Sequence, residues 1–315
     1  MNLTAILKKI KMLPLAMKIA VGAPIVLLII FLIVFLSNPG RGNNNIPAAR
    51  GATGLPGAEL PDLAEAITRL SPGTADPDRD AFVEDYWRWV FSEAGIPERL
   101  ARNVAASALE SPAFVMELLV ILQQDPFTYL LVDKQHALPL DYEPGDLLPL
   151  RAGSFRVARE DLTLRRIAAA ALEEMAAAAA ADGVVLTVGS AYRSAARQAE
   201  IYAWQVRTFG QEAADRQSAR PGTSQHQLGL VVDFSPIDDS FAATPASQWL
   251  IRNAGRFGWS LSYPDNYEEV TGYRFEPWHY RYVGRDLAIF IDTYFEGIQQ
   301  YALQFIRAWQ EQAGG

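Results

Sequence analysis

The sequence predicts a membrane-anchored protein whose larger part is a folded unit of helices and short strands. Three observations predict this organisation. A lysine-rich start precedes an uncharged apolar run over residues 19–36, apolar residues recur at helical spacing between 60 and 127, and short β-branched runs alternate with helical segments after residue 184. With 315 residues, 50% of them hydrophobic, the chain can bury a sizeable core.

The composition excludes several kinds of function. The formal net charge of the chain is −8. When the four lysines ahead of Ser37 are not counted, the remaining chain is more acidic still, which argues against a nucleic-acid groove. The chain has no cysteine, so thiol nucleophiles, disulfides and thiolate zinc ligands are all excluded. Any metal must therefore be held by nitrogen and oxygen.

Residues 1–36 have the pattern of a membrane-targeting segment. Residues 1–18 form a basic segment without an acidic residue, and its lysines are Lys8, Lys9, Lys11 and Lys18. The next segment, 19–36, would span roughly 27 Å as a helix, which matches a bilayer core. Lysines on its N-terminal side place that end in the cytoplasm, so the chain after Ser37 is expected on the periplasmic or cell-wall side of the cytoplasmic membrane.

A cleaved signal peptide is the competing interpretation of this segment. The apolar run is longer than the usual seven to fifteen residues of a signal peptide, and no clear small-x-small cleavage site follows it. Residues 37–60, rich in Asn, Gly and Pro, are typical of a flexible linker, which also disfavours a buried core helix. We therefore expect an uncleaved single-pass anchor.

Residues 61–124 are predicted to form a small helical module. Apolar residues recur at helical spacing over 81–91 and 100–122, interrupted by Pro97 and Pro112. The aromatic cluster between Phe82 and Phe91 has two interpretations, a partner-binding surface or a buried core. Its helical spacing favours the core.

Strands and helices alternate in the next part of the chain. Residues 129–132 predict a short strand. The alanine-rich run 164–181 predicts a helix capped by Thr163 and ended by Gly183. The β-branched run 184–188 then predicts another strand.

A further helix is predicted over 195–209 with Ser194 as its N-cap. Arg193 therefore stands between a strand and a helix N-terminus, where backbone N–H groups already favour an anion. A surface salt bridge is the alternative role for an arginine. The strand-to-helix position favours binding of a ligand carboxylate.

The segments 224–233 and 276–279 contain two of the three histidines in the chain. Leu230–Phe234 predicts a strand, and the odd separation of His226 and Asp233 puts them on opposite faces of an unbroken strand. Their convergence requires a bend, for which Gly229 is the natural place.

A second strand is predicted over 278–283, with His279 on one face and Trp278 and its aromatic neighbours on the other. Pro277 keeps Glu276 off the regular ladder. A turn there can bring the Glu276 carboxylate beside His279 without making it a ligand.

Two imidazoles and one carboxylate complete a three-ligand zinc site with an open fourth position. We predict that His226, Asp233 and His279 bind one Zn²⁺, and that Glu276 takes a proton from the attacking water and passes it to the departing amine. The alternative is a pair of core histidines with unrelated surface carboxylates. His136, with only Asp133 nearby, is predicted to be structural.

At these residues the chain resembles the VanY-type D-alanyl-D-alanine carboxypeptidases, zinc peptidases related to L,D-carboxypeptidases and VanX dipeptidases. The resemblance covers about residues 125–285. Its blocks are Leu131-Val132-Asp133-Lys134, Ser190-Ala191-Tyr192-Arg193-Ser194 with Gln198, Ser224-x-His226-x-x-Gly229-x-x-x-Asp233, and Val270-Thr271-Gly272-Tyr273 with Glu276-Pro277-Trp278-His279. One departure is Val231, where the family often has alanine.

The resemblance implies the same three ligands and the same base as the reasoning from residues. It also implies that Arg193, Gln198 and Ser224 contact the peptide, with Arg193 on its terminal carboxylate. The implied fold is α+β, a small antiparallel sheet flanked by helices with zinc in a cleft, as in hedgehog and D,D-peptidase domains. The tail 286–315 has an apolar stripe at helical spacing, which predicts a C-terminal helix packing on the domain.

The leading hypothesis is a membrane-anchored zinc carboxypeptidase that removes the terminal D-alanine from peptidoglycan stem peptides. Two alternatives stay open: an L,D-carboxypeptidase acting on the tetrapeptide stem, and a non-catalytic zinc-containing module that binds the cell wall. The metal ligands do not distinguish the first two. A missing or misplaced base would favour the third.

Overall fold

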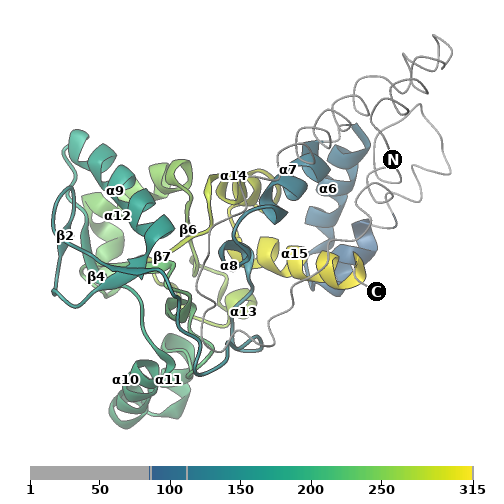
Figure 1. Ribbon diagram of the computed structural model, residues 1–315. Helices are drawn as coiled ribbons and strands as arrows, with labels where there is room; N and C mark the ends of the chain where they lie inside the picture. Colours follow the sequence, from purple (N-terminus) through teal and green to yellow (C-terminus); the bar gives the residue numbers. More distant parts are fainter. Residues whose placement is uncertain (1–84, 86, 111–112, 314–315) are drawn as a thin grey trace, which may run out of the picture.

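The computed structural model describes residues 85, 87–110 and 113–313 (Figure 1). The predicted basic segment 1–18, anchor 19–36 and linker 37–60 lie outside the described residues. Within the part that is described, no helix is both long enough and apolar enough to cross a membrane.

One end of the molecule is a helical body made from both ends of the described chain. It contains helical residues 87–93 and four further helices, α6 (Glu98–Glu110), α7 (Ala113–Leu122), α14 (Arg285–Tyr294) and α15 (Gln299–Ala313). In Figure 1 the blue helices α6 and α7 lie beside the yellow helices α14 and α15. A single hydrophobic cluster joins them, with Phe114 at its centre, its ring 5.1 Å from Trp87 and 5.5 Å from Phe305.

The C-terminal tail forms two helices and not the single helix that the sequence predicts. Glu296 and Gly297 adopt positive φ angles of 55° and 76°, and this turn separates α14 from α15. Of the aromatic cluster between Phe82 and Phe91, Trp87 and Phe91 are fully buried in the core, as the spacing predicts, whereas Trp89 is 43% exposed. The apolar side chains of α14 and α15 pack in the same cluster as Trp87 and Phe91.

The other end of the molecule is built on a five-stranded sheet. Its strand order is β2-β4-β5-β7-β6. The strands are β2 (Arg156–Val157), β4 (Thr187–Ser190), β5 (Val231–Phe234), β7 (His279–Tyr282) and β6 (Trp259–Leu261). The sheet is mixed and not purely antiparallel, since β2 and β4 run parallel while the other neighbours are antiparallel.

Helices and a small second sheet surround these strands. The helices are α8 (Pro126–Tyr129), α9 (Arg166–Ala181), α10 (Ala195–Phe209), α11 (Gln211–Gln217), α12 (Pro245–Asn253) and α13 (Glu268–Thr271), with 3-10 helices η1 (Gln225–Leu228), η2 (Asp239–Ala243) and η3 (Ala254–Phe257). The second sheet pairs β1 (Leu147–Pro149) with β3 (Thr163–Arg165). Helices α9 and α12 share a second hydrophobic cluster with the five strands, whereas α10 and α11 project from the domain (Figure 1).

Local sequence signals fix some of these elements. Helix α10 runs over 195–209 as predicted, and the Ser194 hydroxyl accepts a hydrogen bond from the Arg197 N–H at 3.2 Å. The predicted strand at 129–132 is wrong. The Asp125 carboxylate accepts from the Phe127 N–H at 3.0 Å and Pro126 occupies the first helical position, so a helical turn forms over 126–129, and residues 130–132 follow it without regular structure.

Tertiary pairing moved two other boundaries. Thr163 does not cap the helix after it, because Thr163–Arg165 pairs with β1 and α9 begins only at Arg166. The strand predicted at 184–188 forms as β4 at Thr187–Ser190, opposite β5. Strand pairing outweighed local propensity at both places.

Candidate metal centre and active site

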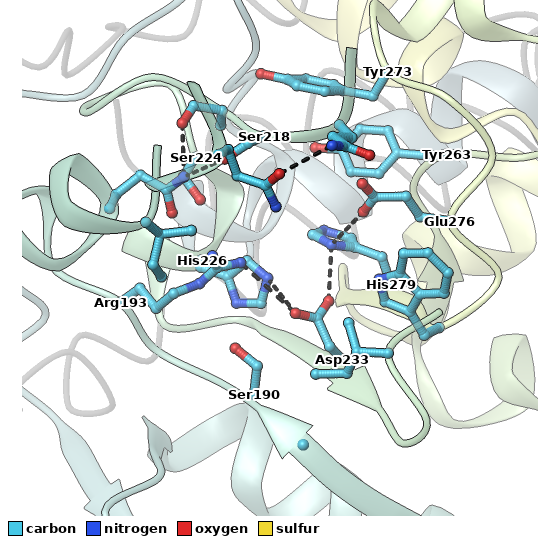
Figure 2. A pocket seen from close by; sticks show the side chains of 18 of the residues that line it. Ser190, Arg193, Ser218, Ser224, His226, Asp233, Tyr263, Tyr273, Glu276 and His279 are labelled. Carbon is cyan, nitrogen blue, oxygen red and sulfur yellow. Dashed lines mark hydrogen bonds and ion pairs between the residues drawn. The ribbon is translucent and has the colours of Figure 1, made fainter. Parts of the chain in front are cut away.

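The two histidines and the aspartate are brought together by the middle of the sheet (Figure 2). Asp233 on β5 stands directly opposite His279 on β7 in the antiparallel register. His226 lies on η1, not on a strand, and Gly229 follows in the left-handed conformation at φ 67° before β5 begins. The bend expected at Gly229 is present. The ligand atoms of the three side chains lie within 4.8 Å of one another.

The carboxylate of Asp233 sits between the two imidazoles. Its Oδ2 is 3.1 Å from His226 Nε2, and its Oδ1 is 3.1 Å from His279 Nδ1. The other nitrogen of His226, Nδ1, lies 2.6 Å from the Ala191 carbonyl oxygen, so Nδ1 carries the proton and Nε2 keeps its lone pair. Each ligand atom therefore points into the same small space.

These three residues fit a metal ion. All three are buried, and although His226 Nε2 and Asp233 Oδ1 each lie 3.1 Å from another atom of the group, neither makes a hydrogen bond of acceptable geometry within the described chain. Buried polar atoms without partners are costly, and a bound cation would satisfy both. Two neutral imidazoles and one carboxylate are a donor set that zinc favours.

Asp233 and His226 already have the charge states that metal binding requires. Burial raises the pKa of the Asp233 carboxyl, but the imidazoles of His226 and His279 outweigh it and hold that pKa well below its usual range. Burial lowers the pKa of His226 to about 4, and the positive charge of Arg193 acts in the same direction. An ionised carboxylate and a neutral imidazole bind metal without first losing a proton.

Glu276 lies beside the metal ligands, outside the three-residue group. It precedes β7, its N–H donates to the Tyr263 carbonyl at 3.0 Å, and its Oε2 lies 3.4 Å from His279 Nδ1. Burial raises the pKa of Glu276 to about 8, with Asp233 adding to the rise and Arg193 opposing it. A dication on the ligands would lower that pKa again, towards the range in which a carboxylate exchanges protons at neutral pH.

This raised pKa predicts how the stability of the metal-free protein depends on pH. Above an ordinary pKa of 4.5 the unfolded chain releases a proton that folded Glu276 still holds, so the free energy of unfolding falls as the pH rises towards 8. One proton gives a slope of at most ~1.4 kcal/mol per pH unit. His226 acts oppositely, because its contribution is lost only as the pH falls from 6.5 towards 4.

Of these two groups, Glu276 is the one whose contribution is expected to change between pH 6.5 and 8. Urea denaturation of the chelator-treated protein should show a midpoint that falls across this window, and Glu276→Gln should flatten the fall. Equal slopes in the two proteins would mean that folded Glu276 is already ionised at pH 6.5.

Arg193 lies where the strand-to-helix loop enters the cleft. Its side chain is 18% exposed, and its Nη2 lies 3.7 Å from Asp233 Oδ2. Its buried Nε has no hydrogen-bond partner among the residues that the structure describes. Burial lowers the pKa of this guanidinium, although Asp233 and Glu276 oppose the shift. The low exposure of this side chain and its contact with buried Asp233 differ from those of a surface salt bridge.

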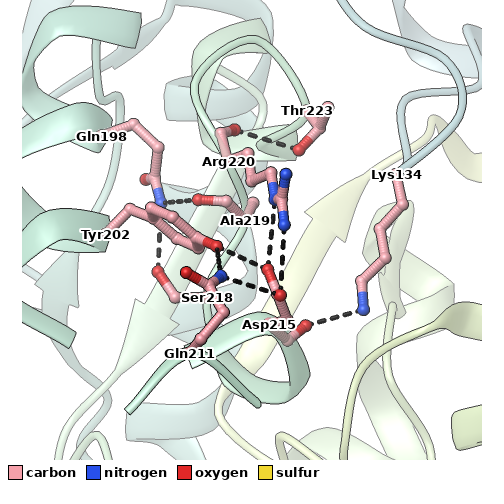
Figure 3. Close-up of polar contacts among 9 residues, drawn as sticks. All are labelled: Lys134, Gln198, Tyr202, Gln211, Asp215, Ser218, Ala219, Arg220 and Thr223. Carbon is pink, nitrogen blue, oxygen red and sulfur yellow. Dashed lines mark hydrogen bonds and ion pairs between the residues drawn. The ribbon is translucent and has the colours of Figure 1, made fainter. Parts of the chain in front are cut away.

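Gln198 and Ser224 also line the cleft. The Gln198 amide donates to the Ala219 carbonyl at 2.6 Å and approaches Ser218 Oγ at 3.4 Å, so one of its functions is to hold the neighbouring loop (Figure 3). Ser224 immediately precedes η1 and is buried. His136 lies elsewhere, with its Nδ1 2.7 Å from Asp133, as expected for a structural histidine.

Three residues of the site carry no signal that the sequence reasoning used: Gln225, Tyr263 and Arg274. The ring of Tyr263 lies 4.7 Å from that of His279 and 4.9 Å from that of Tyr273, and so forms one wall of the cleft (Figure 2). Tyr273 belongs to a block that the resemblance uses. Gln225 and Tyr263 have no local pattern that would mark them, because their role depends on distant partners.

The chain is similar to known carboxypeptidases. Residues 161–285 match the sequence model of the VanY family, described as D-alanyl-D-alanine carboxypeptidase. The putative carboxypeptidase YodJ of Bacillus subtilis is 38% identical over 192 residues, which are 56% of this chain and 70% of that protein. The D-alanyl-D-alanine carboxypeptidase of Enterococcus faecalis is 33% identical over 206 residues, 62% of this chain and 70% of that one.

A solved structure of the D,D-pentapeptidase VanY from a VanB-type resistance cassette, in complex with Zn(II), is 34% identical. It matches 55% of this chain and 96% of its own, with a TM-score of 0.46. The three converging ligands, the adjacent carboxylate and the extent of the sequence match lead to one assignment. This chain belongs to the VanY family of D-alanyl-D-alanine carboxypeptidases, which are metallopeptidases.

Proposed function

We propose that this protein is a zinc carboxypeptidase that removes the terminal D-alanine from peptidoglycan stem peptides. The observation that carries the proposal is that a three-ligand metal group, a buried carboxylate and an unmatched arginine line one cleft. Each supplies a different requirement of the reaction: a Lewis acid site, a proton carrier and a clamp for the chain end.

His226, Asp233 and His279 would hold the zinc ion. When bound, zinc supplies polarisation of the scissile carbonyl and lowers the pKa of water. Asp233 contributes the negative charge of the group, and its short contacts to both imidazoles keep the three donors aimed at one point. The Ala191 carbonyl fixes the orientation of His226.

Glu276 is the residue that moves the proton. Its carboxylate, 3.4 Å from the His279 ring, takes a proton from the attacking water as the new C–O bond forms. The C–N bond then breaks, and the same carboxyl gives its proton to the amine of the departing D-alanine. Burial of Glu276 keeps bulk water from competing for that proton.

The charge of the cleft suits an acidic peptide. Two carboxylates, Asp233 and Glu276, line it together with four arginines, which are Arg159, Arg193, Arg197 and Arg274. Arg193 is the deepest of these and lies closest to Asp233. We therefore assign it the terminal carboxylate, since a fixed anion at that place selects the chain end and aligns its last peptide bond.

Replacing Arg193 with alanine is expected to lower kcat/KM by ~10- to 100-fold, the usual worth of a hydrogen bond to a charged group. Amidating the C-terminus of the peptide should harm hydrolysis by the wild type and make little further difference to Arg193→Ala. Arg197→Ala, on the exposed rim, is the matched control. Equal sensitivity of the two variants to amidation would contradict the assignment.

We further propose that residues 19–36 anchor the protein in the cytoplasmic membrane, with the catalytic domain on the extracytoplasmic side. The support is the uncharged run behind four lysines, together with a substrate class that lies outside that membrane. Fractionation of cells producing the full chain, followed by protease treatment of intact spheroplasts, tests it. A soluble protein, or one protected from the protease, would overturn the proposal.

The decisive test of activity uses defined stem peptides. The protein is incubated with pentapeptide and with tetrapeptide stems, with and without chelator, and released D-alanine is measured. Chelator-sensitive release from the pentapeptide supports the proposal. Release from the tetrapeptide alone would identify an L,D-carboxypeptidase instead, and zinc-bound protein that hydrolyses neither would be a binding module.

A further inference from the structure

The second nitrogen of His279 has a partner of its own. Nδ1 faces Asp233 at 3.1 Å, and Nε2 lies 3.4 Å from the side-chain oxygen of Gln225. A ring nitrogen that binds a metal must offer its lone pair, so the proton of a neutral imidazole then has to sit on the other nitrogen. Gln225 Oε1 is the acceptor for that proton.

Two donors converge on this one amide oxygen. Gln225, the residue before ligand His226, is 2% exposed, and its Oε1 accepts from Ser262 Oγ at 2.8 Å as well as from His279. If the amide were turned round, its NH₂ group would face His279 Nε2. The imidazole would then have to accept there and carry its proton on Nδ1, the nitrogen that faces Asp233.

The serine is held in turn by the C-terminal helix. Gln299, the first residue of α15, is 1% exposed. Its Oε1, 3.3 Å from Ser262 Oγ, is a second and more distant acceptor for the one serine proton, and its Nε2 donates to the Ser260 carbonyl at 3.3 Å. The family match ends at residue 285, so this contact comes from a segment outside it. The helical body thus reaches the outer shell of the metal ligands.

We propose that Gln225 is a positioning residue that sets the tautomer of His279, and that Ser262 and Gln299 hold Gln225 in the required orientation. Helix α15, which lies outside the residues matched by the family, then helps to orient the metal ligands within the matched residues. The inference rests on the proposed metal binding, but it concerns the affinity of the site for zinc and needs no substrate.

The chain offers a matched pair of buried glutamines for the test. Gln227, two residues after Gln225, is 1% exposed, and its amide donates to the carbonyls of Pro139 and Tyr142, away from the ligands. Zinc affinity is measured by chelator competition, and thermal unfolding of the metal-free proteins reports stability. Gln225→Leu should weaken zinc binding by ~10- to 100-fold, as other outer-shell changes do. Gln227→Leu should change stability without that loss of affinity.

The tautomer itself can be observed. Because the chain has only three histidines, ¹⁵N NMR of the metal-free protein can assign each ring. Asp233 draws the His279 proton towards Nδ1 and Gln225 Oε1 draws it towards Nε2, so Gln225→Leu should raise the fraction of the Nδ1–H form above that of the wild type. An unchanged His279 tautomer, or equal losses of zinc affinity in the Gln225 and Gln227 variants, would overturn the role of Gln225.

Gln299 and its neighbour Gln300 form a second matched pair on α15. Gln300 is also buried, but its amide donates to Asp133 Oδ2 at 2.9 Å and not to the serine. Gln299→Met should weaken zinc binding several-fold more than Gln300→Met does. Equal affinities would remove α15 from the proposal.

Failure of this inference and failure of the proposed function are distinguishable. A wild-type protein that binds zinc but hydrolyses no stem peptide would refute the carboxypeptidase assignment and leave the role of Gln225 intact. Conversely, normal peptide hydrolysis and normal zinc affinity in Gln225→Leu would refute only the role of Gln225.

Discussion

Replacing Glu276 with glutamine is expected to reduce hydrolysis of stem peptides by ~10²- to 10⁴-fold, the usual contribution of a general acid–base group. The amide keeps the size of the side chain and an acceptor oxygen, but it cannot take up a proton at neutral pH. The wild-type carboxyl, with its raised pKa of about 8 before metal binds, is suited to both halves of the proton transfer.

The zinc content of the Glu276→Gln protein should stay at one ion per chain. Glu276 stands outside the three-residue metal group, so its loss removes no donor. Metal content by plasma mass spectrometry and turnover of the pentapeptide are measured on the same sample. Retained turnover in this variant would refute the mechanism, whereas loss of zinc would show that Glu276 acts as a ligand.

Replacing Asp233 with asparagine is expected to abolish zinc binding at micromolar metal and, with it, detectable hydrolysis. The change removes the only negative charge of the ligand set, and an amide oxygen is a weaker donor to zinc than a carboxylate. The loss of affinity should exceed the ~10- to 100-fold typical of outer-shell changes.

Asp161→Asn is a suitable control for this variant, since Asp161 is exposed and pairs only with Arg159 at the rim of the cleft. It should bind zinc as the wild type does. Addition of zinc at high concentration to the Asp233 variant separates weak binding from misfolding. Full zinc occupancy at ordinary concentrations in Asp233→Asn would mean that the two histidines suffice to hold the ion.

Short-range patterns predicted the parts of the fold that short-range forces decide. Ser194 capped its helix because a serine hydroxyl can reach the N–H three residues on, whatever the rest of the chain does. Gly229 bent the chain because only glycine adopts its conformation without strain. Thr163 had the right residue type for a cap, but pairing with β1 placed it in a strand.

The candidate ligands could also be named from the sequence, since two histidines with nearby carboxylates stood out in a chain that has three histidines in all. Their geometry could not be predicted from the sequence. The reasoning put a bend at Gly229 between His226 and the strand Leu230–Phe234 but assigned His226 to no element, and the structure has it on a 3-10 helix. The register that sets Asp233 opposite His279 depends on strands that are far apart along the chain.

By itself the sequence determined the donor types, their order, the helix cap at Ser194 and the apolar stripe of the tail, because each depends on residues a few positions apart. Only the tertiary structure decided that α15 packs with the helices before residue 123, and that Gln299 reaches the residues behind His279. Hydrophobic burial is not directional, so an apolar stripe does not specify which surface will cover it. A buried amide does require a particular partner, but that partner is defined only once the chain has folded.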